Sequence, residues 1–215
     1  TCALPIWSEG FVSSGVFRDP AAWYHIVVAV DTTQATSSNR LFVYVNGVAC
    51  PGTYTYPSQN FTTIWNTTNV QYIGARNSST WFSDSYLTEI NSIDGLQLTP
   101  NSFGTFNSYG VWQPITYGGS YGTNGFYLPF NAGTTSSYAG SFTTSKYLSV
   151  ANNAAFQFGT GDFTVETWFN PTTLSGTPGG NQSLVGLWGG ATTQASWLLY
   201  LSSGSLIWYT SRSEE

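Results

Sequence analysis

The sequence contains few side chains that could catalyse a reaction, and carboxylates come first among them. Hydrolysis of a glycosidic bond uses two carboxyl groups, one to protonate the leaving oxygen and one to attack or to stabilise positive charge. Asp162 and Glu166 lie four residues apart, which places both on one face of a strand. We interpret Asp162 as a turn residue at the start of this strand and Glu166 as a side chain on its solvent face. No catalytic residue is therefore predicted.

Histidine and cysteine chemistry is equally sparse. His25 is the only histidine, and it lies between Tyr24 and Ile26 in a run of strand-forming residues. Nucleophilic catalysis would need an activated serine beside it, and we assign that role to no serine of this sequence. We expect a packed or hydrogen-bonded sheet histidine. Of the two cysteines, Cys2 and Cys50, neither has metal-binding spacing, and we expect Cys50 to be a small, partly buried apolar residue rather than half of a disulfide.

Calcium is the metal that the remaining carboxylates could bind. It takes about six to eight oxygen ligands. Asp31, Asp84, Asp94 and Asp162 are scattered along the chain and form no D-x-D-x-D loop. We therefore predict no metal and no other cofactor, with calcium as the alternative.

Tryptophans in polar loops carry the main signal for binding. Trp65 and Trp81 lie among Asn, Ser and Thr residues. Such an indole can stack on the apolar face of a sugar while amides such as those of Asn66 and Asn77 bond its hydroxyls. These four residues form the predicted carbohydrate-binding site. The alternative is that loop aromatics, Trp112 and Trp188 included, close the end of the fold.

Composition bounds the possible partners. Charged residues make up 7 % of the chain, hydrophobic residues 41 % and aromatic residues 17 %, which is typical of a globular β protein with ample core. A formal net charge of −5 argues against nucleic acid and against anionic membrane surfaces. No apolar run reaches the roughly 18 residues of a spanning helix.

The elements that must position these residues are strands. The run from Trp23 to Asp31 is β-branched and aromatic, and Leu41–Val45 alternates before Asn46-Gly47, a pair that favours a tight hairpin turn. Phe163–Phe169 alternates as well. Further strands are expected at 184–188, 197–201 and 205–209, and Trp23, Trp168, Trp197 and Trp208 are expected to pack in the core.

The amino-acid sequences of these strands resemble those of a known module. W-Y-H-I-V-V-A-V-D at 23–31 and V-Y-V-N-G at 43–47 resemble the second half of a laminin-G-like, concanavalin A-type jelly-roll module. D-F-T-V-E-T-W-F at 162–169 resembles the opening half. The resemblance implies an all-β, concanavalin A-like jelly-roll sandwich. The E-x-D-x-x-E triplet of the glucanases that share this fold is missing from the sequence.

The two resemblances divide the chain. We expect residues 7–104 to be the C-terminal half of one module, 105–137 a Gly/Tyr/Ser-rich linker, and 138–211 the N-terminal half of a second, tandem module. Each half alone would leave one sheet face uncovered. Phe17–Leu98 is therefore expected to dock against Lys146–Tyr209 as one sandwich in circularly permuted order.

The two ends look foreign to this fold. Ala3–Ile6 can be encoded by GCTCTTCCGATC, whose reverse complement, preceded by A, encodes Arg212–Glu215. Both strings resemble a sequencing adapter. We expect residues 1–6 and 212–215 to be adapter-derived and the chain to be a fragment of an environmental open reading frame.

The function follows from the resemblance and from the loop aromatics. Glu89–Pro100 and Tyr121–Leu128 resemble modules of bacteriophage virion proteins. We expect a non-catalytic glycan-binding and structural module of a virion surface or tail protein, located on the virion or outside the cell. Its partners would be an extracellular polysaccharide or cell-surface glycan and other copies of the virion protein. The alternatives are an architectural protein-contact domain and a glycoside hydrolase of the same fold.

Overall fold

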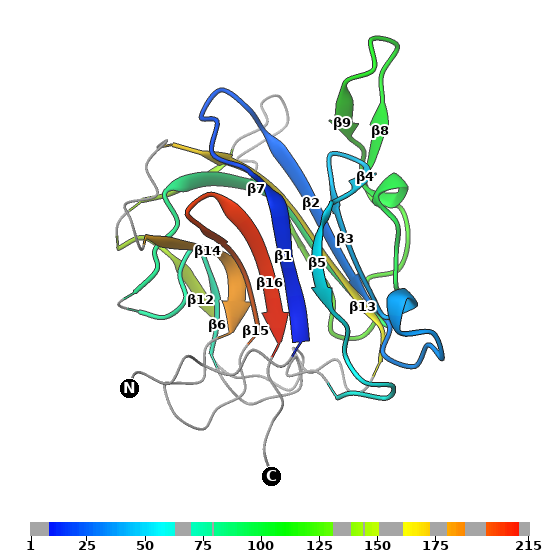
Figure 1. Cartoon of the computed structure of the whole chain (residues 1–215). Helices are drawn as coiled ribbons and strands as arrows, with labels where there is room; N and C mark the ends of the chain where they lie inside the picture. The colour runs from blue at the N-terminus through cyan, green and yellow to red at the C-terminus, as the bar shows by residue number, and fades with distance from the viewer. Residues whose placement is uncertain are drawn as a thin grey trace.

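The computed structural model describes residues 9–62, 70–78, 80–130, 139–143, 145–150, 161–172, 180–187 and 197–210. Within these residues the chain forms two seven-stranded antiparallel sheets that face each other, and a separate hairpin (Figure 1). The expected all-β sandwich is confirmed, and its architecture is compatible with a jelly roll. None of the described residues forms a helix long and apolar enough to cross a membrane.

We refer to the two sheets as A and B. Sheet A contains, in spatial order, β12 (Leu148–Val150), β6 (Gln71–Ile73), β14 (Asn181–Leu187), β15 (Trp197–Ser202), β16 (Ser205–Thr210), β1 (Glu9–Val16) and β5 (Gly52–Thr55). Sheet B contains β10 (Phe126–Leu128), β7 (Ser85–Asp94), β13 (Phe163–Pro171), β2 (Tyr24–Val30), β3 (Leu41–Val45) and β4 (Val48–Ala49), with β11 (Gly140–Phe142) also paired to β7. The hairpin is β8 (Gly104–Phe106) and β9 (Trp112–Pro114).

Local sequence explains the central strands. β2 is rich in β-branched residues, which suit a pleated and covered surface, and every residue from His25 to Val30 is buried. The β3–β4 turn has positive φ at Asn46 (49°) and Gly47 (80°), as the predicted Asn-Gly hairpin requires. Two short 3₁₀ turns, Ser37–Asn39 and Pro100–Ser102, lie in the connections.

The two sequence blocks interleave in both sheets. β13 lies between β2 and β7, with Phe163 opposite Val30 on one side and Asp94 on the other. In sheet A, β16 pairs with β1, and β14 pairs with β6. The expectation that both blocks build one sandwich is therefore confirmed.

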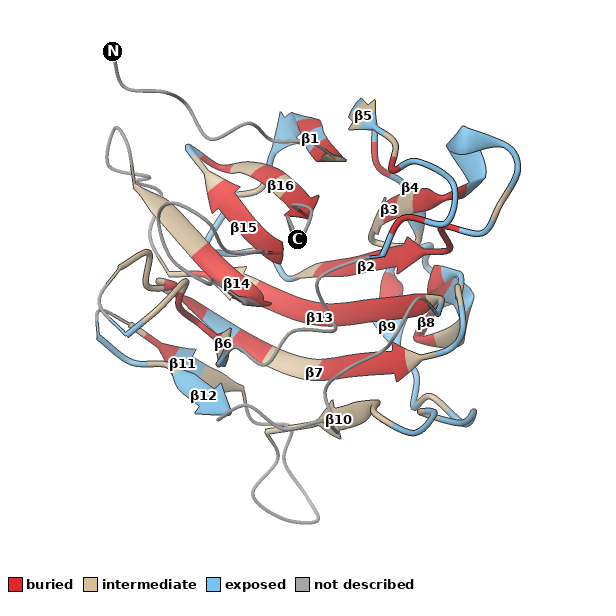
Figure 2. Ribbon diagram, turned by 90° about the horizontal axis from the view of Figure 1, so that it is seen from below, coloured by how far each residue is buried: buried red, intermediate tan, exposed pale blue. Residues whose placement is uncertain are grey.

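The core lies between the inner faces of the sheets. Ile26 and Val28 of β2 and Phe163 and Val165 of β13 point into it, and Trp208 of β16 meets them from sheet A. Figure 2 shows buried residues running along β2, β13 and β7. Trp197 and Trp208 are core residues as expected, but Trp23 is not: it precedes β2 and is 42 % exposed. Its expected place in a core strand is wrong because the strand begins one residue later.

The outer face of sheet B is covered by residues 96–125. Val27 and Ile93 on this face form a second apolar cluster with Phe103. The hydroxyl of Thr164 on β13 accepts the N–H of Leu98 at 2.8 Å and donates to the carbonyl of Leu96 at 2.8 Å, which ties the segment to the sheet. Part of the predicted linker thus contains the short strands β8, β9 and β10 and acts as a cover.

Candidate functional site

Of the four predicted carbohydrate-binding residues, Trp65 and Asn66 lie outside the described residues. Asn77 and Trp81 lie on the connection between β6 and β7. The side-chain oxygen of Asn77 accepts the backbone N–H of Thr80 at 2.8 Å and its hydroxyl at 2.9 Å, which closes a tight turn. The backbone N–H of Ser183 on β14 donates to the carbonyl of Trp81 at 3.1 Å. The loop is therefore held against sheet A, and the structure brings Asn77 and Trp81 into one loop, with Trp81 directly after the turn that Asn77 closes.

Trp81 packs on the outer face of sheet A. Its ring centroid lies 5.2 Å from that of Tyr200 on β15, and the guanidinium carbon of Arg76 lies 4.1 Å from the centre of its ring. The buried side chains of Leu198 and Tyr209 lie beneath it. Trp81 is half-buried, so the indole offers part of its surface to solvent.

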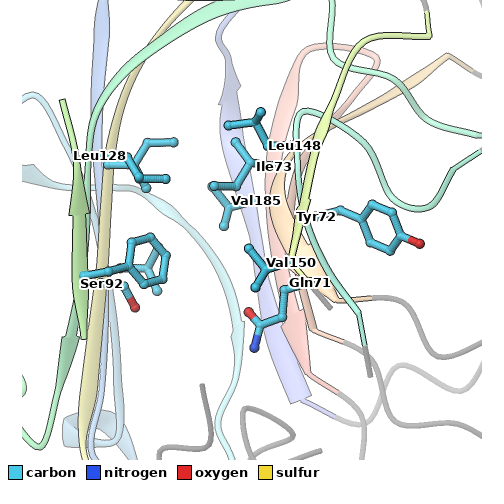
Figure 3. Close-up of a pocket in the computed structure, with 11 residues that line it drawn as sticks. Gln71, Tyr72, Ile73, Ser92, Leu128, Leu148, Val150 and Val185 are labelled. Atoms are coloured by element: carbon cyan, nitrogen blue, oxygen red, sulfur yellow. The ribbon is translucent and has the colours of Figure 1, made fainter. Parts of the chain in front are cut away.

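Further aromatic rings extend this surface towards the sheet edge. The ring of Tyr72 on β6 lies 5.7 Å from that of Tyr147, which in turn lies 6.2 Å from the stacked ring of Phe82. Tyr72 points away from the space between the sheets (Figure 3). We call this surface the aromatic face and define it by its six rings: Tyr72, Trp81, Phe82, Tyr147, Tyr200 and Tyr209.

Arg76 is the charged group of the aromatic face. Burial lowers the pKa of its guanidinium, while the neighbouring Tyr209 and Tyr200 oppose that shift. Burial also raises the pKa of Tyr200 to about 12, so this phenol stays neutral and can donate a hydrogen bond. The half-buried ring of Trp81 and the guanidinium of Arg76 can stack on a sugar ring and bond its hydroxyls or a carboxylate, while Tyr200 and Tyr209, each 4 % exposed, support them from beneath.

A second cluster, of hydrogen-bonded polar side chains around His25 and Glu166, lies on the outer face of sheet B. The indole N–H of Trp112 donates to Nδ1 of His25 at 2.9 Å, so Nε2 of His25 carries the proton and faces Oε1 of Glu166 at 2.9 Å. The side-chain amide of Asn91 donates to Oε2 of Glu166 at 2.5 Å, and Tyr121 donates to Oδ1 of Asn91 at 2.8 Å. The expected hydrogen-bonded sheet histidine is present.

The expected exposure of Glu166 is wrong. Its side chain does face away from the sandwich core, but it is only 1 % exposed because residues 96–125 cover it. Burial raises the pKa of Glu166 well above the usual range, although the hydrogen bond from Asn91 acts to lower it. Burial lowers the pKa of His25 to about 3, so the imidazole is neutral. Since Nδ1 of His25 accepts from Trp112, Nε2 lies against the buried Glu166 and His25 is 0 % exposed, the network joins the cover to the sheet and does not face a substrate.

The structure brings together two of the four aspartates that the sequence scatters. Asp31 follows β2 and Asp162 precedes β13, and the ends of these antiparallel neighbours meet. Asp31 accepts hydrogen bonds from the backbone N–H of Thr33 at 2.9 Å and its hydroxyl at 2.6 Å, and also from Gln34. Burial of Asp31 disfavours its charge, but these bonds and one from Asp162 outweigh it and lower its pKa. Burial and the bond to Asp31 raise the pKa of Asp162 to about 6.

This carboxyl pair is not a complete metal site. In the part of the chain that the structure describes, no group of three or more His, Cys, Asp or Glu side chains could hold a metal ion. Asp84 instead accepts the hydroxyl of Thr172 at 2.7 Å, and Asp94 accepts the N–H of Asn124 at 3.1 Å. Cys50 is free and buried, as expected, while Cys2 lies outside the described residues.

Comparison of the chain with known protein families, with curated proteins and with solved structures finds no match. The likeness to laminin-G-like modules therefore rests on the residues quoted for it.

Proposed function

We propose that this chain is a non-catalytic glycan-binding and structural module of a virion surface or tail protein. Its ligand would be an extracellular polysaccharide or a cell-surface glycan. The observation that carries this proposal is the aromatic face, where Trp81 lies against Arg76 and Tyr200 on a rigid sheet. The virion setting and contacts with other copies of the virion protein rest on the sequence resemblance.

The chemistry of the aromatic face supports a sugar ligand. Sugar rings present apolar C–H faces that pack on aromatic rings, and their hydroxyls bond to fixed donors and acceptors. The half-buried rings of Trp81 and Phe82 supply apolar area at small entropic cost because the loop is already held by Asn77. Arg76 adds a planar donor that suits acidic sugars.

The test is retention on immobilised polysaccharides and on a glycan array. Trp81→Ala should weaken retention by about tenfold or more, the loss expected when a central aromatic anchor is removed. Trp23→Ala is the matched control, because Trp23 is also partly exposed but lies before β2 of sheet B. Circular dichroism should show both variants folded. Equal retention of wild type and Trp81→Ala would contradict the proposal at this residue, and Trp65→Ala tests the other predicted tryptophan.

A purely architectural function is the second candidate, and the β8–β9 hairpin favours it. The hairpin projects from the sandwich (Figure 1), and Tyr109 at its tip is 89 % exposed. Asn107 holds the tip, since its side-chain oxygen accepts the N–H groups of Tyr109 and Val111 at 2.9 Å each. The chain has no charged residue from Gly95 to Ser145. A rigid, uncharged tip with an exposed tyrosine is typical of protein-contact surfaces.

Self-association and glycan retention, measured on two variants, distinguish the architectural function from glycan binding. Tyr109→Ser should abolish self-association, measured by analytical ultracentrifugation, if the module is architectural, and leave glycan retention intact. Loss of retention in Trp81→Ala without change in association supports glycan binding. For the third alternative, a glycoside hydrolase, the measurement is release of reducing sugars. We expect none, because Glu166 is buried and Asp162 pairs with Asp31.

A further inference from the structure

A cavity of about 170 Å³ lies between the two sheets, on the opposite side of sheet A from the aromatic face (Figure 3). β6, β12 and β14 supply one wall, and β7, β10 and β13 supply the other. Its lining is almost entirely aliphatic and aromatic, with Ile73 and Val185 facing Ile90, Leu128 and Val165.

The strand registers explain why one polar side chain lies in this apolar lining. On β7, Ile90 and Ser92 point inwards, while Asn91 and Ile93 point to the outer face of sheet B. Ser92 pairs with Phe126 of β10 and with Val165 of β13, so apolar neighbours flank it on both sides. Figure 3 shows Ser92 on one wall and Val150 and Gln71 on the opposite wall.

The hydroxyl of Ser92 has no hydrogen-bond partner among the described residues, although the side chain is only 1 % exposed. A buried hydroxyl without a partner is costly and calls for an explanation such as a bound molecule. A trapped water is a poor explanation, because a stable buried water needs about two to four polar partners. The only other polar side chain at the lining, apart from the outward-pointing Tyr72, is that of Gln71.

The size of the cavity sets the size of the ligand. Apolar protein cavities of about 150 Å³ stay dry and bind a molecule such as benzene. A cavity of about 170 Å³ therefore holds one six-membered ring with one substituent. Leu148 and Val150 of β12 line it while being 43 % and 41 % exposed, so the ligand enters past this edge strand.

We propose that this cavity binds a small aromatic alcohol of the phenol class. The ring packs between Ile73 and Val185 on one side and Ile90 and Val165 on the other, and the ligand hydroxyl bonds to Oγ of Ser92. This site goes beyond glycan binding and is independent of it, because Tyr72 of the aromatic face points away from the cavity.

The test compares phenol with benzene, which has the same ring and no hydroxyl, by isothermal titration calorimetry or by NMR titration. Phenol should bind about tenfold more tightly than benzene to the wild type, the difference expected for one buried hydrogen bond. Ser92→Ala should reduce phenol affinity to that of benzene or below it, because the ligand hydroxyl then has no partner, and should leave benzene binding nearly unchanged. Ser92→Ile fills the cavity from the same position and should abolish binding of both probes.

Ser183→Ala is the matched control. Ser183 is also a fully buried serine without a partner among the described residues, but it does not line the cavity. Its variant should bind both probes as the wild type does. Failure of the wild type to bind either probe overturns the proposal, and so does an unchanged ratio of phenol to benzene affinity in Ser92→Ala. Ser92→Ala removes only one unpaired oxygen, so the comparison of phenol with benzene in this variant remains valid even if Ser92→Ile does not fold.

Discussion

The indole of Trp112 lies over the imidazole of His25, with ring centroids 5.8 Å apart, and Phe106 packs edge-on against it at 4.9 Å. Trp112→Ala should lower the free energy of unfolding by about 3–5 kcal/mol, because a large buried ring is lost and a cavity remains. Trp112→Phe keeps most of the ring but leaves Nδ1 of His25 without its donor, which should cost about 1–3 kcal/mol. Urea denaturation measures both. No loss in Trp112→Phe would show that the hydrogen bond contributes nothing, and equal losses in the two variants would show that the packing of the ring contributes nothing beyond it.

Asp162 should make the stability of the fold depend on pH. Its pKa is about 6 in the folded protein against 3.8 for the free group, so between these values the folded state holds more protons than the unfolded state. The contribution of Asp162 to the free energy of unfolding is therefore fully present below about pH 4 and is lost as pH rises through about 6. Asp162→Asn can donate a hydrogen bond to Asp31 at every pH.

The measurement is the melting temperature of wild type and Asp162→Asn between pH 4 and pH 7. The melting temperature of Asp162→Asn should rise relative to that of the wild type as pH rises. His25 and Glu166 also have shifted pKa values, but both proteins contain them, so their effect cancels in this comparison. Parallel curves would contradict the assigned proton sharing between Asp31 and Asp162.

At the scale of elements, the β3–β4 turn and the β8–β9 hairpin meet at Trp112. Gly47 has a φ of +80°, and a Cβ added there would lie 2.5 Å from Cε3 of Trp112. Gly47→Ala should therefore destabilise the fold twice, through left-handed backbone strain of about 1–2 kcal/mol and through a clash that costs about 1–3 kcal/mol. Chemical denaturation measures the sum.

Gly95→Ala isolates the strain. Gly95 has a φ of +84° and no atom within 4 Å of an added Cβ, so only the backbone cost applies. A loss in Gly47→Ala no larger than in Gly95→Ala would show that the hairpin yields to the added methyl group. The expected larger loss would show that Trp112 is held firmly by the network beneath it.

At the scale of the whole molecule, folding depends on β13. It pairs with both β2 and β7, and its removal would leave two unpaired edges in the middle of sheet B. A fragment ending at residue 137 also lacks β14, β15 and β16, so it should show no cooperative thermal transition and should bind a hydrophobic dye. Mixing it with a fragment of residues 138–215 should restore the transition. Cooperative unfolding of the first fragment alone would mean that it folds as an independent unit.

Local patterns predicted the strands β2, β3, β13, β14, β15 and β16 but missed others, among them β1. Its sequence, E-G-F-V-S-S-G-V, has little strand propensity, and it forms a strand because it lies between β16 and β5. Residues 105–137 were expected to be a linker, and their short extended pieces are the strands β8, β9 and β10, of which β10 extends sheet B. Pairing partners distant in the sequence decide both cases.

The sequence alone determined the all-β class, the Asn46-Gly47 turn and the face of β13 on which Glu166 lies, because propensity, turn geometry and alternation act between near neighbours. Only the tertiary structure decided that Glu166 is buried, that Asp31 meets Asp162 and that Trp81 packs on Tyr200. Only the tertiary structure decided the cavity beside Ser92 as well, since it is the volume that side chains from six strands leave unfilled. Burial and voids depend on what covers a face, and that cover comes from distant parts of the chain.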